Sequence, residues 1–158
     1  MKIFTICLAL CTSVCIDAFS QTNNASEYSG QVKYESSAAT TAGTVTVTSS
    51  GFGKKRVNAA ADASASAIYV LLFRGIAGSQ YELPMITDET KINNSVVQEI
   101  LKGGYGSFIT ESTLTDEVKQ TRKTDGVKGV SDIYRITINC DALRRYLEKN
   151  KVIRKFGI

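Results

Sequence analysis

The stretch Thr44–Ile76 constrains the fold of this chain more than any other part of the sequence. It opens with an alternation in which Val45 and Val47 lie on one side and threonines on the other, and this period of two in β-branched residues predicts a half-buried strand. From Lys54 to Gly75 the apolar residues recur every three or four positions, which predicts a long helix. We therefore expect this helix to lie across a sheet that contains the preceding strand.

Two glycines and a row of small residues define how that strand and helix should meet. Gly51 and Gly53 are predicted to form the corner between them. Small and apolar side chains, Ala63 and Val57 among them, form the helix side that should pack against another backbone. The opposite side should face water through a polar line, which consists of Asn58, Asp62, Ser66 and Tyr69.

Composition limits the chemistry that this chain can perform. Its 158 residues predict one domain, and an apolar fraction of 43% is ordinary for a globular protein. Histidine is absent, which excludes Ser-His-Asp and Cys-His catalysis and nearly all common zinc sites. The net charge of +4 favours contact with an anionic surface without establishing one. We predict no catalytic residue, no metal ligand and no cofactor.

Residues 1–20 have the pattern of a signal peptide. Lys2 is followed by the apolar run Ile3–Ile16, and Ala18-Phe19-Ser20 supplies the small residues that a signal peptidase requires before Gln21. The alternative, a membrane anchor, needs about 20 apolar residues, and Asp17 interrupts the run before that length. The sequence therefore predicts export to the periplasm or beyond the cell, without a membrane span in the mature chain.

The cysteines fit the same interpretation. Cys7, Cys11 and Cys15 lie in the predicted signal peptide, and the leucine and valine that precede the last two fit a lipoprotein motif poorly. Export without a lipid anchor is thus favoured, with a lipid on Cys15 as the alternative. The mature chain would keep only Cys140, which ends an apolar alternation and should be a buried thiol without a disulfide.

Extended and helical patterns alternate along the rest of the chain. They predict an edge strand within Gln31–Ser36, a short helix over Ser95–Leu101, strands over Tyr105–Lys119 and Val127–Cys140, and a helix after Asp141. The Asp-Gly pair at 125–126 predicts a hairpin between the two long strands. Asp141 is expected to cap the last helix, and the tail 151–158 is expected to be extended.

These elements predict an α+β two-layer domain with a mixed sheet of about four strands and helices packed on one face. We divide the chain into a signal peptide (1–20), a polar N-terminal segment with the edge strand (21–43) and a single α+β domain (44–158). In the long connection after the central helix, the apolar side chains of Leu83, Met85 and Ile86 are expected to pack against the underside of the domain.

The order of these motifs carries a family resemblance. A strand ending in Gly-x-Gly is followed by a helix with small residues every three or four places, then by a long hairpin and a capping helix. The residues that match are Val45, Val47, Gly51, Gly53, Ala59, Ala63, Ala67, Tyr134, Ile136, Ile138 and Leu143. The pattern resembles small exported bacterial envelope domains and is similar to the N-terminal domain of flagellar assembly protein T. The resemblance covers most of Thr44–Leu147, and implies a role in assembly or interaction in the envelope, with no catalytic residues.

Two groups of basic residues are the candidate anion-binding residues. The early group is Lys54, Lys55 and Arg56, and the late group is Arg144, Arg145, Lys149, Arg154 and Lys155. Together they could form one face for an anionic polymer or lipid head groups, and the simpler interpretation is a solvated surface. Few aromatic residues lie among them, which argues against nucleic acid. The early group follows Ser50–Gly53, which resembles a phosphate-binding loop in composition but lacks the spacing of the nucleotide motif.

Three hypotheses for function remain at this stage. The first is an exported, non-enzymatic envelope protein that acts through protein–protein interaction or assembly, with another envelope protein as partner and oligomerisation left open. The alternative is a binding module for an anionic envelope ligand, polysaccharide or lipid head groups, that uses the late basic group. A histidine-free hydrolase would need a pair of carboxylates. No spacing singles out such a pair among Glu111, Asp116, Glu117, Asp132 and Asp141.

Overall fold

The computed structural model describes residues 30–36, 41–124 and 127–155. The predicted signal peptide, its cleavage site before Gln21 and the Asp-Gly turn at 125–126 lie outside the described residues. Within these ranges, no helix is both long enough and apolar enough to span a bilayer.

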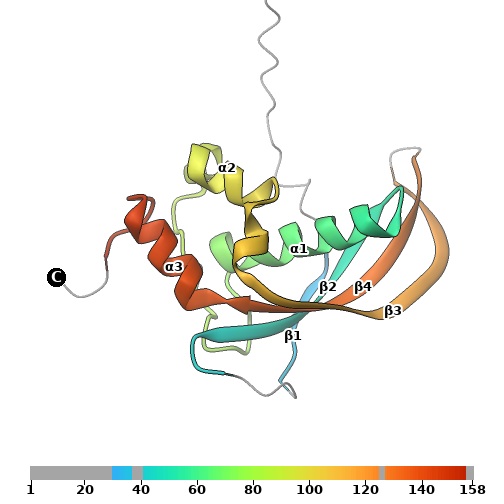
Figure 1. Cartoon of the computed structure of the whole chain (residues 1–158), viewed down its shortest axis with the longest axis horizontal. Helices are drawn as coiled ribbons and strands as arrows, with labels where there is room; N and C mark the ends of the chain where they lie inside the picture. The colour runs from blue at the N-terminus through green and yellow to red at the C-terminus, as the bar shows by residue number, and fades with distance from the viewer. Residues whose placement is uncertain (1–29, 37–40, 125–126, 156–158) are drawn as a thin grey trace, which may run out of the picture.

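The chain forms a four-stranded sheet with helices on one side (Figure 1). In chain order the elements are β1 (Val32–Tyr34), β2 (Thr44–Gly53), α1 (Arg56–Phe73), the 3-10 turn η2 (Glu89–Asn93), α2 (Ser95–Leu101), the 3-10 turn η3 (Gly104–Ser107), β3 (Ile109–Thr124), β4 (Val127–Asn139) and α3 (Cys140–Lys149). The strand order is β1-β2-β4-β3. This arrangement confirms the predicted α+β class, the short helix, the edge strand and the pairing of the two long strands.

The expectation of a mixed sheet is wrong, because every neighbouring pair of described strands is antiparallel. The chain that leaves α1 does not return directly to a strand beside β2. It first passes through α2 and enters the sheet at its far edge as β3, and the hairpin then brings β4 back antiparallel to β2.

The core lies between the sheet and α1. Val45 and Val47 of β2 and Ile136 and Ile138 of β4 are buried on the helix side of the sheet. α2 packs on the same side as α1, and α3 continues from the end of β4 (Figure 1). β3 is an edge strand of the sheet and pairs with the edge of β4 that lies away from β2.

The glycines of β2 do not form a corner as predicted. β2 continues through both of them, and a Cβ atom added to Gly51 would lie 1.9 Å from the carbonyl oxygen of Ala59. Beside it, the Ser49 hydroxyl donates a 2.8 Å hydrogen bond to the Ala63 carbonyl. The glycine therefore serves a close approach of strand and helix, because any side chain there would displace the backbone of α1.

The predicted faces of α1 are also partly wrong. Val57 is 72% exposed, whereas Ser66 and Tyr69 of the expected polar line are buried. Asp62 does not simply face water either, because its Oδ2 accepts a 2.8 Å hydrogen bond from the Phe52 amide. Residues 56–58 at the start of α1 are exposed, whereas 63–69 are all buried, so the helix is covered on more than one side there and a single amphipathic stripe misassigns it.

The end of the chain differs from the prediction in two details. Asn139, not Asp141, caps α3, because its side chain accepts a 2.9 Å hydrogen bond from the Ala142 amide. The tail is not extended over its described part. It turns back after α3 at Lys151, whose φ is 59°, and buries Val152.

Two further predictions concern buried side chains. Cys140 is buried, as expected. Of the residues expected under the domain, Ile86 is buried, Met85 is half-buried and Leu83 is 81% exposed.

Candidate functional site

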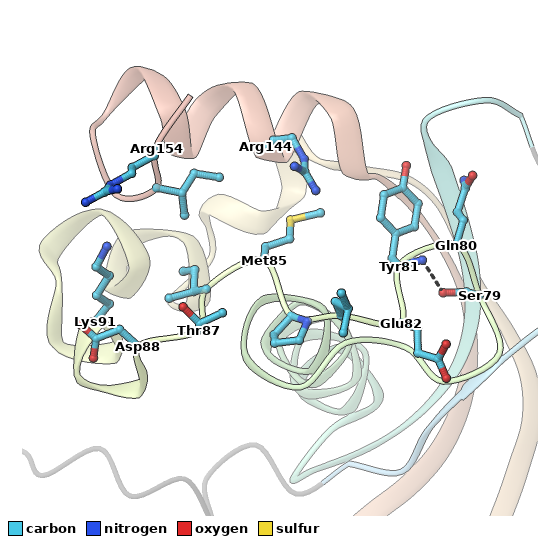
Figure 2. A pocket seen from close by; sticks show the side chains of 14 residues that line it. Ser79, Gln80, Tyr81, Glu82, Met85, Thr87, Asp88, Lys91, Arg144 and Arg154 are labelled. Carbon is cyan, nitrogen blue, oxygen red and sulfur yellow. Dashed lines mark hydrogen bonds between the residues drawn. The ribbon is translucent and has the colours of Figure 1, made fainter. Parts of the chain in front are cut away.

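A groove of about 640 Å³ separates α3 from the connection between α1 and α2 (Figure 2). We call it the α3 groove. Its lining comes from three parts of the chain: residues 79–88, Lys91 of η2, and Arg144 with Ile153 and Arg154. Concave sites that combine apolar and polar groups in this way are where small proteins most often bind ligands.

The wall formed by the connection is held in place by the end of α1. Gly75 adopts a φ of 76° and ends the helix, and the Ile76 amide then donates to the Tyr81 carbonyl at 2.7 Å. Further along, the Ile86 amide donates to the Leu72 carbonyl at 2.8 Å. Because the last carbonyl groups of a helix lack partners within the helix, the bond from Ile86 satisfies one carbonyl of α1 and fixes the wall to the helix. The bond between Ile76 and Tyr81 closes the turn within the connection.

Charged residues line the groove on both walls (Figure 2). Arg144 and Arg154 come from the α3 side, and Glu82, Asp88 and Lys91 come from the opposite side. The lining thus carries three cations against two carboxylates. Its charge is positive along α3 and mixed along the connection.

Two of these charged groups have structural roles as well. The Lys91 ammonium donates to the Val152 carbonyl, which joins η2 to the segment after α3. Asp88 caps η2 by accepting hydrogen bonds from the hydroxyl and the amide of Thr90, and these bonds hold the pKa of its carboxyl below the usual value. Asp88 therefore stays ionised at neutral pH.

Cys140 lies at the start of α3, in contact with Tyr81 of the groove. Burial raises the pKa of the Cys140 thiol to about 12, and burial likewise raises the pKa of Tyr81 to about 12. Because the thiolate is the nucleophilic form of cysteine, this thiol is inert at neutral pH.

A second depression, of about 630 Å³, adjoins the groove beyond the end of α3. We call it the C-terminal hollow. It shares Lys91, Ile153 and Arg154 with the groove and is otherwise lined by Glu148, Lys151, Val152 and Lys155. Four cations against one carboxylate make it the more basic of the two depressions.

The structure divides the late basic group that the sequence singled out. Arg144 and Arg154 line the α3 groove, and Lys155 lines the C-terminal hollow. Arg145 and Lys149 are exposed on α3 and belong to neither lining.

The early basic group lies at the other end of the molecule, so the two groups do not form one face. Thr44 pairs with Asn139, directly before α3, whereas Gly53 at the far end of β2 precedes Lys54 and Lys55. A strand of this length separates the two groups by about 30 Å. Ser50–Gly53, the segment compared with a phosphate-binding loop, belongs to β2.

Arg56 of the early group is engaged with two carboxylates. Its Nη2 lies 2.9 Å from Glu117 Oε1, and its Nε lies 3.3 Å from Oδ2 of the fully buried Asp132. The Tyr134 hydroxyl lies 3.4 Å from the same Oδ2 and 3.2 Å from the Arg56 carbonyl, while Asp132 Oδ1 has no hydrogen-bond partner among the described atoms. Burial, and then the charge of Asp132, raises the pKa of Tyr134. We call these four residues the Arg56 cluster.

The Arg56 cluster contains the carboxylate pair that no sequence spacing revealed. Glu117 and Asp132 are partners across β3 and β4, so the strand register alone brings them together. Both charges are met by one guanidinium, which makes the pair a structural ion-pair network. Within the described residues, no group of three His, Cys, Asp or Glu side chains is placed to hold a metal ion.

Sequence reasoning missed the wall of the α3 groove that the long connection forms. It expected Met85 to pack under the domain and assigned no role to Tyr81, Glu82 or Lys91. The length of the connection was the only signal, since connections longer than about 12 residues are often functional.

The chain was compared with protein-family models, with curated proteins and with solved structures, and none of the three comparisons finds a match.

Proposed function

We propose that this chain is an exported cell-envelope protein that acts without catalysis, by binding another envelope protein in the α3 groove. The observation that carries the proposal is the groove itself. Its lining combines apolar side chains, which include Met85 and Ile153, with charged side chains on both walls. Protein interfaces likewise combine apolar and polar side chains. The signal-peptide pattern of residues 1–20 supports export.

Three features favour binding over catalysis. The chain has no histidine. Its thiol beside the groove is buried, with a pKa of about 12, and so lacks a nucleophilic form at neutral pH. The carboxylate pair Glu117 and Asp132 is bridged by Arg56, so both groups already serve an ion-pair network inside the fold.

A second candidate function is binding of an anionic envelope ligand, polysaccharide or lipid head groups. The observation that favours it is the C-terminal hollow, where Lys91, Lys151, Arg154 and Lys155 outnumber the one carboxylate. Such attraction would be electrostatic and would weaken as salt rises.

Site-specific cross-linking in the producing cells tests the first proposal. A photo-reactive amino acid replaces Leu83, which is 81% exposed at the groove, or Thr113, which is exposed on β3 far from it. We expect a discrete protein adduct in the envelope fraction from position 83 and none from position 113. Export is measured separately, by N-terminal sequencing for a start at Gln21. Adducts of equal yield from both positions, or from neither, would contradict a partner in the groove.

A further inference from the structure

We infer that the α3 groove and the C-terminal hollow together bind an extended protein segment in which a short acidic run adjoins an apolar residue. This inference rests on the proposed function and specifies the partner's chemistry. The two depressions adjoin each other, because Lys91, Ile153 and Arg154 line both. A single extended segment that passes over these shared residues can therefore contact both.

The hollow determines where the acidic run lies. Lys151, Arg154 and Lys155 are exposed there, and Lys91 adds a fourth cation from η2. Charges this close act together, since the screening length at physiological salt is about 8 Å. Arg154 also offers the planar donor fork that binds a carboxylate through two hydrogen bonds.

Lys151 adds a second observation at the hollow. Its φ of 59° places it in the left-handed region, a position after a helix that glycine usually occupies. A lysine held there, with its ammonium group among the cations of the hollow, fits a role for its charge in binding.

The α3 groove determines where the apolar residue lies. Met85 points into the groove from the connection (Figure 2). Ile153 lines both the groove and the hollow. A flexible thioether adapts its shape to different apolar partners. Leu83 at 81% exposure extends this apolar surface at the groove. An apolar side chain next to the acidic run would be buried on these residues.

The mixed charge of the connection wall favours a protein segment over a uniformly charged ligand. Glu82 and Asp88 are among the lining residues of the same groove, so a polyanion that filled its length would lie beside two carboxylates. A flat lipid surface cannot follow a concave depression between two walls. A protein segment has the required pattern, because it can carry acidic groups at one end only and be neutral or basic beside Glu82.

The experiment uses the purified protein and a fluorescein-labelled peptide with four acidic residues followed by leucine and phenylalanine, measured by fluorescence anisotropy. One double variant, Arg154→Gln with Lys155→Gln, removes two exposed cations of the hollow. The matched control, Arg145→Gln with Lys149→Gln, removes two exposed cations outside both depressions. We expect the first double variant to weaken binding about tenfold, which corresponds to about 1.4 kcal/mol. The control should weaken binding less than about twofold, because its two positions lie outside both depressions. Replacing leucine and phenylalanine by serine in the peptide should weaken binding severalfold.

Several results would overturn the inference. Equal loss in the two double variants would mean that binding follows net charge alone. Undiminished binding of the serine peptide or of polyglutamate would mean a polyanion site, and tighter binding to phosphatidylglycerol vesicles with the same dependence on Arg154 and Lys155 would mean a lipid site. The cross-link from position 83 separates this inference from the proposed function. If the adduct persists in Arg154→Gln with Lys155→Gln, a partner occupies the groove but does not need the acidic run.

Discussion

Arg56 and Arg154 lie at opposite ends of the molecule, and their surroundings differ in one decisive respect. Arg56 is held by Glu117 and by the buried Asp132, so its charge is used inside the fold. Arg154 is exposed between two depressions, and no described carboxylate forms an ion pair with it. The comparison shows that the role of a basic residue depends on which groups the fold brings beside it. Strand register gave Arg56 its partners, whereas the turn after α3 left Arg154 at an open surface.

The largest expected effect concerns the close packing beneath α1 near the Arg56 cluster. Gly51→Ala should destabilise the protein by about 3 kcal/mol or prevent folding, because the added Cβ would meet the Ala59 carbonyl at 1.9 Å and backbone cannot yield cheaply. Gly106→Ala is the matched control, since nothing lies within 4 Å of its added Cβ. Denaturant midpoints measure both. Similar midpoints for the two variants would show that strand and helix are not in such close contact.

The second prediction tests the comparison directly. Arg56→Ala should cost about 2 to 3 kcal/mol, because it leaves the buried Asp132 carboxylate without its cation; the cost stays below that of a fully buried pair since the Arg56 side chain is 54% exposed. Arg154→Ala should cost less than about 0.5 kcal/mol, as is usual for a surface position. Thermal and chemical denaturation of the two variants provide the measurement. A reversed order would mean that the roles of the two ends have been exchanged.

The third prediction concerns how stability depends on pH through Cys140 and Tyr81, which lie beside the α3 groove. The folded-state pKa values of Cys140 and Tyr81, both about 12, lie above their ordinary values of 9.0 and 10.0, so the folded state holds these protons more tightly than the unfolded state. Stability from this source is complete below about pH 9 and is lost as pH rises toward 12, because the unfolded state then binds fewer protons.

Unfolding free energies between pH 7 and 11 measure this loss, and Cys140→Ala should delay its onset by about one pH unit because tyrosine titrates later than cysteine in the unfolded chain. A thiol reagent at pH 8 offers an independent check, since the buried Cys140 should react only as fast as the protein unfolds. Rapid modification of the folded protein would contradict the burial on which the pKa depends.

The smallest expected effect is a gain. Lys151→Gly should stabilise the protein by about 0.5 to 1 kcal/mol, because glycine adopts the left-handed conformation without strain. The same change should weaken binding of the acidic peptide, since the C-terminal hollow loses a cation. Lys151→Asn is the control, as asparagine tolerates this conformation without restoring the charge. A gain in stability with unchanged peptide binding would leave Lys151 as a turn residue only.

The elements of the fold followed from local patterns in the sequence. Alternation over Val45 and Val47 predicted β2, two long extended patterns predicted the pair β3 and β4, and apolar periodicity predicted α1 and α2. These signals are readable because hydrophobic period and turn chemistry act over a few neighbouring residues. The α+β class could therefore be predicted before the structure.

The tertiary structure decided how these elements meet. Gly51 was assigned to a corner because the role of a glycine depends on which atoms pack against it, and the sequence does not show that the Ala59 carbonyl does so here. Tyr69 and Ser66 looked exposed because a single stripe cannot show that a helix is covered on several sides. The direction of the strands was likewise settled by the path of the chain between them.

The same division holds for the candidate site. The sequence by itself identified Arg144, Arg154 and Lys155 as basic residues that could bind anions, since charge is a property of the residue. Only the tertiary structure separated them from Arg145 and Lys149, joined them to Lys91 and Met85 from a distant connection, and placed Arg56 beside Asp132. The physical reason is that a groove forms between segments far apart in the chain, and no local pattern records the distance between them.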